Sequence, residues 1–155
     1  MTPAIVAARQ AGVSCQVLEY RHDPATQSFG LEAAEALRVD SCKVFKTLVA
    51  SLATGDLAVA VIPVDTRLDL KALATAAGVK KAVMAGREAA ERATGYVIGG
   101  ISPLGQRRRL ATMVDESALT HEQIYVSGGR RGLEIALRPR DLVTLTKATL
   151  CRIGR

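Results

Sequence analysis

The sequence predicts a single α+β domain with a mixed, mainly antiparallel sheet and flanking helices, and three observations lead to it. The length of 155 residues fits one domain of about 100–200 residues. Alternating, strand-like segments are joined by tight turns that contain glycine, as in hairpins. Helices and strands mix without the strict β-α-β order of a doubly wound parallel sheet. No linker or repeat divides the chain, so we expect residues 1–155 to form one domain.

The first half of the chain predicts three helices and three strands. Thr2 can cap the first helix, Pro3 is tolerated in its first turn, and Gly12 ends it. Two alternating segments around Gly55 predict a hairpin. The expected elements are a helix over 2–11, a strand over 15–20, a helix over 31–37, strands over 44–52 and 57–62, and a helix over 69–77.

The second half is richer in strands. Short alternating segments predict strands over 79–84, 96–101, 111–114, 123–126, 133–137 and 149–153, and helical periodicity predicts helices over 87–93 and 141–146. Within these elements Asp65 and Asp69 are interpreted as turn and cap residues, and Glu91 as a solvated helix residue. His22-Asp23-Pro24 predicts a turn and not a metal site.

The composition restricts the classes of function. Lys and Arg number 21 against 15 Asp and Glu, a net charge of +6, which favours a polyanionic partner; charge that serves only solubility is the equal alternative. Three dispersed cysteines without a His/Cys cluster predict no disulfide and no metal, and hence a cytoplasmic protein. No apolar run approaches the roughly 18 residues of a membrane helix and no leader is visible, so we expect no membrane association.

Two glycine-rich segments, residues 94–106 and 125–134, are the first candidate ligand loops. Neither is a P-loop or a dinucleotide fingerprint, but glycine lets backbone amides approach a ligand oxygen closely, as in an anion nest or oxyanion hole. Tight turns are the alternative, and for Gly128-Gly129 they are at least as good an explanation. Arginines follow the first segment and the Gly128-Gly129 pair of the second, and they are placed to contact a phosphate backbone, with a solvated loop as the alternative: Arg107, Arg108, Arg109, Arg130 and Arg131.

Lys46 is the second candidate feature. Period-2 alternation places it on the same strand face as Val44 and Leu48, where a lysine is costly unless it is exposed or paired. The residues alone favour a lysine that prevents an exposed edge strand from pairing with another chain. The alternative is a cation that faces a phosphate or a carbonyl.

With these residues in view, the chain resembles the YbaK family of tRNA-editing proteins, freestanding relatives of the editing insertion in bacterial prolyl-tRNA synthetase. The likeness rests chiefly on residues 94–106 and extends over almost the whole chain. It also includes Thr2-Pro3-Ala4, Tyr20, His22-Asp23-Pro24, Phe29-Gly30, residues 44–48, 58–63 and 68–71, and residues 124–129. The resemblance implies the editing-domain fold.

The resemblance also implies a set of site residues. Lys46 matches the family's essential strand lysine, and residues 99–103 match its Gly-x-x-x-Pro loop. Glu134 stands where the family usually has an aspartate, one methylene shorter. Gly99, Gly100 and Ile101 are therefore expected to hold the substrate carbonyl, and Tyr20, Phe29, Ser102, Pro103 and Glu134 to border the substrate.

The implied activity is cofactor-free and metal-free deacylation of mischarged tRNA. The subgroup it resembles most removes cysteine from Cys-tRNA(Pro), and the cysteinyl thiol can supply the nucleophile. Prolyl-tRNA synthetase is an expected further partner in a ternary complex, and DNA is not expected as a ligand. Removal of alanine from Ala-tRNA(Pro) by a bound water and a non-catalytic tRNA- or synthetase-binding module stay as alternatives.

Overall fold

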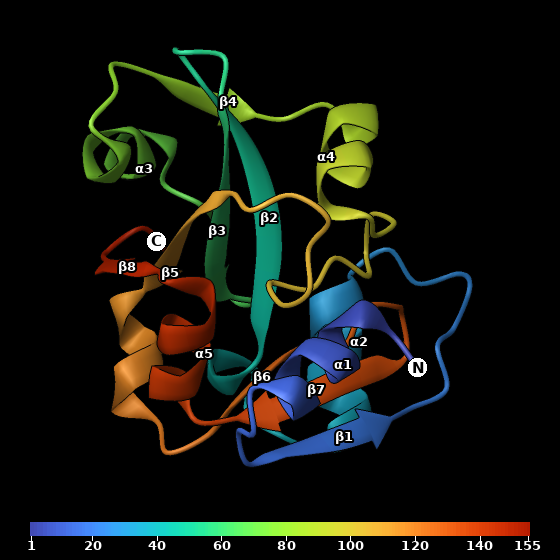
Figure 1. Ribbon diagram of the computed structural model, residues 1–155. Coiled ribbons are helices and arrows are strands. Elements are labelled where there is room, and N and C mark those ends of the chain that lie inside the picture. Colours follow the sequence, from blue (N-terminus) through green and yellow to red (C-terminus); the bar gives the residue numbers. More distant parts are fainter.

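The computed structural model describes residues 1–155 and contains two β-sheets (Figure 1). The larger sheet has the strand order β4-β2-β3-β5-β8 and the smaller one β1-β7-β6. The strands of the larger sheet are β2 (Phe45–Leu52), β3 (Leu57–Pro63), β4 (Ala82–Met84), β5 (Ala111–Asp115) and β8 (Thr149–Cys151). Those of the smaller sheet are β1 (Cys15–Glu19), β6 (Ile124–Ser127) and β7 (Leu133–Leu137).

Most strand pairs are antiparallel, which confirms the predicted fold class. Only β3 with β5 and β5 with β8 run parallel. Strands β2 and β3 form the expected hairpin, with Lys46 opposite Ile62 and Ser51 opposite Leu57. Strand β4 pairs only with residues 50–52 of β2, so the first half of β2 has no neighbour from the larger sheet on that side.

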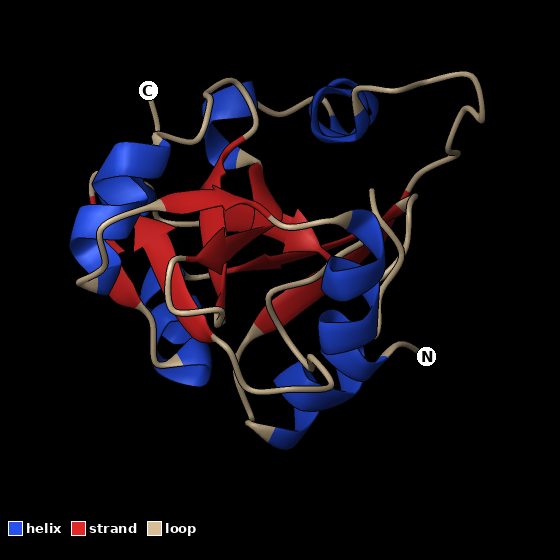
Figure 2. Ribbon diagram, turned by 90° about the horizontal axis from the view of Figure 1, so that it is seen from above, coloured by secondary structure: helices blue, strands red, loops and turns tan.

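The helices are α1 (Pro3–Gln10), α2 (Phe29–Leu37), α3 (Leu70–Ala77), α4 (Arg87–Thr94) and α5 (Pro139–Thr146), with short 3₁₀ turns at Ser41–Lys43 and Glu116–Thr120. The side chain of Thr2 accepts a hydrogen bond from the Ile5 amide, and that of Asp69 accepts one from the Ala72 amide. Both expected N-caps are thus present, and they satisfy amides that a helix leaves unpaired at its start. Figure 2 shows the strands in the centre and the helices around them.

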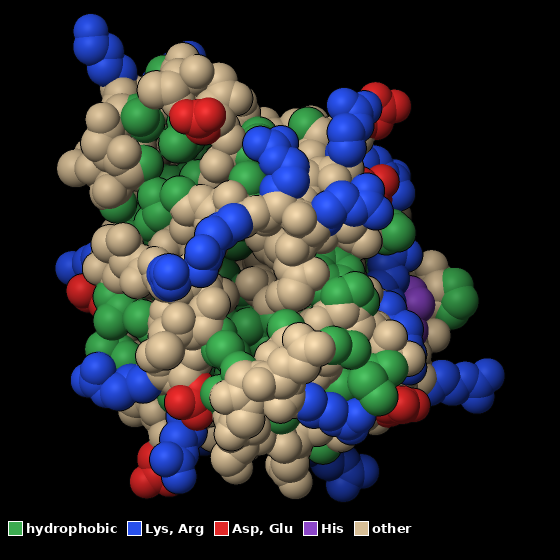
Figure 3. All heavy atoms as spheres, viewed as in Figure 1, with side chains coloured by type: hydrophobic (Ala, Val, Ile, Leu, Met, Phe, Trp, Pro, Cys, Tyr) green, Lys and Arg blue, Asp and Glu red, His purple; other side chains and the backbone are tan.

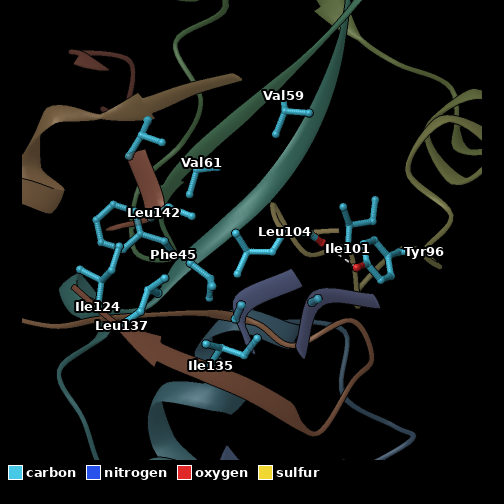
Figure 4. Packing of buried hydrophobic residues seen from close by; sticks show 14 of the residues in the cluster. Phe45, Val59, Val61, Tyr96, Ile101, Leu104, Ile124, Ile135, Leu137 and Leu142 are labelled. Atoms are coloured by element: carbon cyan, nitrogen blue, oxygen red, sulfur yellow. Dashed lines mark hydrogen bonds between the residues drawn. The ribbon is translucent and has the colours of Figure 1, made fainter. Parts of the chain in front are cut away.

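The main core lies between the two sheets. It is a cluster of 21 buried residues that includes Phe45 and Val61 of the larger sheet and Ile124 and Leu137 of the smaller one (Figure 4). A second cluster packs α3 against the other face of the larger sheet through Leu73. A third, small cluster holds α2 against the chain near Val44 and Val64.

The expected strand over residues 96–101 is wrong. Its alternating residues suggested a strand, but Gly99 has φ +91° and the Gly100 amide donates to the Val97 carbonyl at 2.8 Å, so the segment is a turn. Four other boundaries differ by two residues or more: α2 begins at Phe29, α5 begins at Pro139, β4 begins at Ala82, and β8 ends at Cys151. No helix is long and apolar enough to cross a bilayer.

Candidate active site

A pocket of about 670 Å³ lies along the open half of β2, a volume within the range of small-molecule sites. Its walls come from segments that are distant in sequence: the residue after β1, the start of α2, β2, the loop after β3, the 98–101 loop and β7. The pocket therefore forms only when both sheets and α2 are assembled. Of the expected site residues it brings together Tyr20, Phe29, Lys46, Gly99, Ile101, Arg130 and Glu134.

Lys46 is a half-buried cation in this pocket. Strand β2 fixes its direction, and no carboxylate lies within ion-pair distance of its ammonium group. Burial lowers the pKa of Lys46; the nearby charge of Asp65 opposes this effect and that of Arg67 adds to it. An ammonium group without a protein partner at a pocket wall is suited to bind an anionic or carbonyl oxygen of a ligand.

Thr47 is a pocket residue that the sequence analysis missed. Its side chain is 8% exposed, and its hydroxyl is the one buried side-chain oxygen or nitrogen without a hydrogen-bond partner. A buried hydroxyl left unpaired costs about 1–3 kcal/mol. The available signal was its position between two core residues, Phe45 and Val49, on the inward face of the strand.

Glu134 is a buried carboxyl on the central strand of the smaller sheet. It lies opposite Leu18 of β1 and Ser127 of β6, is 6% exposed, and forms no ion pair. Burial raises the pKa of Glu134 to about 8. Burial and then the charge of Glu134 raise the pKa of Tyr20 to about 12, so the Tyr20 phenol keeps its proton throughout the physiological range.

The glycine loop presents two free amides. The Gly100 amide already donates to the Val97 carbonyl at 2.8 Å, whereas the amides of Gly99 and Ile101 donate to no acceptor in the protein. Both of those residues line the pocket, and Gly100 does not. Of the three residues expected to hold a carbonyl oxygen, only Gly99 and Ile101 therefore have a donor to offer.

The two glycine segments meet beside the pocket. A Cβ on Gly100 would lie 2.8 Å from the Cα of Arg130, and the Ser127 hydroxyl donates to the Gly100 carbonyl at 3.1 Å. A Cβ on Gly99 would lie 2.8 Å from the ring of Phe29. Glycine is required at these contacts because any larger residue would displace a neighbouring wall of the pocket.

Ser102 and Pro103, which the resemblance places beside the substrate, do not line this pocket. Ser102 is fully buried and its hydroxyl accepts a hydrogen bond from the Leu104 amide at 3.2 Å. Pro103 lines a second cavity of about 300 Å³ next to α5. The Gly-x-x-x-Pro segment leaves the pocket after Ile101 because the chain turns inward to the core.

The five arginines divide into three groups. Arg107, Arg108 and Arg109 are exposed, form no ion pair, and line the second cavity. Arg130 lines the main pocket and lies 3.7 Å from Glu19. The guanidinium of Arg131 covers the Phe29 ring and donates to the Ile98 carbonyl at 2.7 Å. Figure 3 shows Lys and Arg side chains spread over the whole visible face.

Two further interpretations are settled by the structure. Glu91 is not merely solvated, because its carboxylate accepts a hydrogen bond from the Ile98 amide at 2.7 Å. The segment around Asp23 is the expected turn, in which His22 lies 2.7 Å from Glu32. No group of three or more His, Cys, Asp or Glu side chains is placed to hold a metal ion.

Comparison with known proteins identifies the family. The model of the aminoacyl-tRNA editing domain matches residues 23–145. The chain belongs to this family. A candidate Cys-tRNA(Pro)/Cys-tRNA(Cys) deacylase of Enterococcus faecalis, EbsC, is 40% identical over 120 residues, which span 77% of this chain and 73% of that protein.

Solved structures share the fold of this editing domain over its whole length. The hypothetical protein APE2540 has a TM-score of 0.89 at 26% identity, covering 99% of this chain and 100% of that one. A candidate trans-editing enzyme for prolyl-tRNA synthetase has a TM-score of 0.82 at 25% identity, covering 100% and 99%. The pocket residues from Phe29 to Glu134 all lie in the region that the family model matches.

Proposed function

We propose that this editing-domain protein is a trans-acting aminoacyl-tRNA deacylase that removes cysteine from Cys-tRNA(Pro). The observation that carries the proposal is the pocket, in which the unpaired cation of Lys46 shares a cavity with the free amides of Gly99 and Ile101. The names of the relatives support the choice of substrate, since one is a candidate deacylase of cysteinyl-tRNA and another a candidate editing enzyme for prolyl-tRNA synthetase.

Each free polar group of the pocket has a partner in an aminoacylated 3′ end. Lys46 binds a phosphate or ribose oxygen of the terminal adenosine, where a charge-assisted contact is stronger than a neutral one. The amides of Gly99 and Ile101 hold the ester carbonyl oxygen. Glu134 binds the substrate α-amino group.

The substrate thiol supplies the nucleophile. Its sulfur forms a bond to the ester carbonyl carbon, the bond from that carbon to the ribose oxygen breaks, and the thiol proton passes to the ribose oxygen. The products are tRNA with a free hydroxyl and a four-membered thiolactone of cysteine, which water then opens. Correct orientation of the thiol contributes up to about 7–11 kcal/mol, and one oxyanion donor about 2.7–4 kcal/mol.

Residues 1–155 work as one editing domain, because the main core joins α1 at one end of the chain to α5 near the other. Arg107, Arg108 and Arg109 contact the tRNA backbone outside the pocket, which their exposure and lack of ion pairs support. The protein acts in the cytoplasm, without a cofactor, and meets its substrate in a complex that includes prolyl-tRNA synthetase.

A panel of charged tRNAs tests this function. The purified protein is mixed with an excess of Cys-tRNA(Pro), Ser-tRNA(Pro), Ala-tRNA(Pro) or S-methylcysteinyl-tRNA(Pro), and loss of each ester is followed over time. We expect repeated turnover of the cysteinyl ester and far slower loss of the others, which lack a thiolate. Equal rates would establish attack by water, faster alanyl loss would favour the alanyl deacylase, and stoichiometric protection of every ester would indicate a binding module.

A further inference from the structure

Two charged side chains hold the backbone of Ile98 from opposite sides. Its amide donates to Oε2 of Glu91 at 2.7 Å, and its carbonyl accepts from Nη2 of Arg131 at 2.7 Å. Glu91 belongs to α4 and Arg131 to the turn between β6 and β7. Charge-assisted hydrogen bonds of this length are about twice as strong as neutral ones.

Each of these side chains has one further contact. Arg87 lies 3.6 Å from the Glu91 carboxylate, one turn earlier on α4. The guanidinium of Arg131 lies 4.1 Å from the centre of the Phe29 ring, at the start of α2. The loop is thus tied to α4 on one side and, through Phe29, to α2 on the other.

The carbonyl that Arg131 holds and the free amide of Gly99 belong to the same peptide unit. Because this unit is planar and trans, the Ile98 carbonyl and the Gly99 amide point in opposite directions. Holding the carbonyl therefore decides where the Gly99 amide points. Glycine tolerates many backbone conformations, and Gly99 has φ +91°, so without this hold the peptide is free to rotate.

We propose that Glu91 and Arg131 are positioning residues that aim the Gly99 amide into the pocket. The proposal rests on the proposed function, because the aimed amide is useful there as a donor to the ester carbonyl. It also gives Arg131 a role different from the tRNA contact expected of it, since its guanidinium is occupied by Ile98 and Phe29. Glu91 and Arg131 act through the loop and do not touch the substrate.

Single-turnover kinetics separates positioning from binding. Glu91→Ala and Arg131→Ala are measured with Cys-tRNA(Pro) at saturating enzyme, and affinity is measured separately with uncharged tRNA. We expect about 100-fold slower cleavage, the scale of a misplacement near 1 Å, with unchanged affinity for tRNA. Glu91→Gln should keep most of the cleavage rate because its amide oxygen still accepts a hydrogen bond from the Ile98 amide. Arg131→Lys should lose much of the rate because lysine lacks the planar guanidinium group.

Glu88→Ala on the same helix and Arg140→Ala on α5 are matched controls, because both residues are exposed and form no ion pair. Hydrogen exchange of the Ile98 amide gives a readout that does not require activity, and it should accelerate in Glu91→Ala only. Faster exchange with an unchanged cleavage rate, or unchanged exchange in a folded Glu91→Ala, would overturn the proposal. If the wild type clears no charged tRNA, the proposed function fails, and the exchange result alone decides whether Glu91 holds the loop.

Discussion

The guanidinium of Arg131 lies 4.1 Å from the centroid of the Phe29 ring, and this contact joins the second glycine segment to the first turn of α2. Phe29 lines the pocket, and β2 forms another of its walls. Three polar groups of the pocket have no partner in the protein: the ammonium of Lys46 and the amides of Gly99 and Ile101. A ligand with matching polar groups accounts for all of them together.

Glu134 should make the stability of the fold depend on pH. Its pKa is near 4.5 in an unfolded chain and about 8 in the folded protein, so between these values the folded state binds more protons and stability falls as pH rises. Glu134→Gln removes the ionisable group at nearly constant size. The free energy of unfolding of Glu134→Gln should therefore rise relative to that of the wild type as the pH increases from 4.5 to 8. The increase should be at most about 1.4 kcal/mol per pH unit.

Urea unfolding at pH 5, 6.5 and 8 measures that gain. The carboxyl contributes its full stability below pH 4.5, and that contribution is lost as pH rises through 8, so the two proteins should differ least at pH 5. A difference that is the same at all three pH values would show that Glu134 ionises in the folded state as it does in the unfolded chain.

Thr47→Val should separate stability from activity. Replacing a buried, unpaired hydroxyl by a methyl group of the same shape removes a desolvation cost of about 1–3 kcal/mol, so the free energy of unfolding should rise. Clearance of Cys-tRNA(Pro) should stay near the wild-type rate, because the hydroxyl is buried away from the pocket surface. Thr47→Ser keeps the hydroxyl and should show no gain in stability. A Thr47→Val variant that is no more stable than the wild type would show that the hydroxyl has a partner in the fold.

Arg107, Arg108 and Arg109 should dominate the salt dependence of tRNA binding. Each phosphate contact contributes a slope of about −0.7 to −0.9 in a plot of log affinity against log salt. Changing all three to Gln should therefore reduce the slope by about two to three. A control with Arg92, Arg140 and Arg152 changed to Gln loses the same charge from other exposed positions. Equal slopes in the two triple variants would mean that the salt dependence of tRNA binding is set by net charge alone and not by these three positions.

Most of the fold could be predicted from local patterns. The β2–β3 hairpin, the caps at Thr2 and Asp69 and the strand position of Lys46 follow from alternation and capping residues. The strand predicted over 96–101 was wrong because the φ of Gly99 and the turn at Gly100 outweigh the alternation of the neighbouring apolar residues.

The pocket could be predicted only in part. Lys46 was found through its place on an alternating strand, and Tyr20, Phe29 and Glu134 through resemblance; the structure brings all four together. The contacts of Glu91 and Arg131 with Ile98 join residues from different elements, and no local periodicity encodes such a contact. For the same reason the sequence did not show that Ser102 turns into the core.

The central claim is that deacylation depends on Lys46. It is tested most directly by one assay that compares how the wild type and Lys46→Ala clear an excess of Cys-tRNA(Pro). We predict many turnovers for the wild type and a loss in Lys46→Ala of at least about 2–3 kcal/mol in kcat/KM, which is about 30- to 150-fold. Lys46→Arg should retain part of the rate, and Lys80→Ala, at an exposed site, all of it. Circular dichroism and melting should show that Lys46→Ala is folded, because the change removes a cation from a desolvated position. A folded Lys46→Ala that clears Cys-tRNA(Pro) at the wild-type rate would contradict the account.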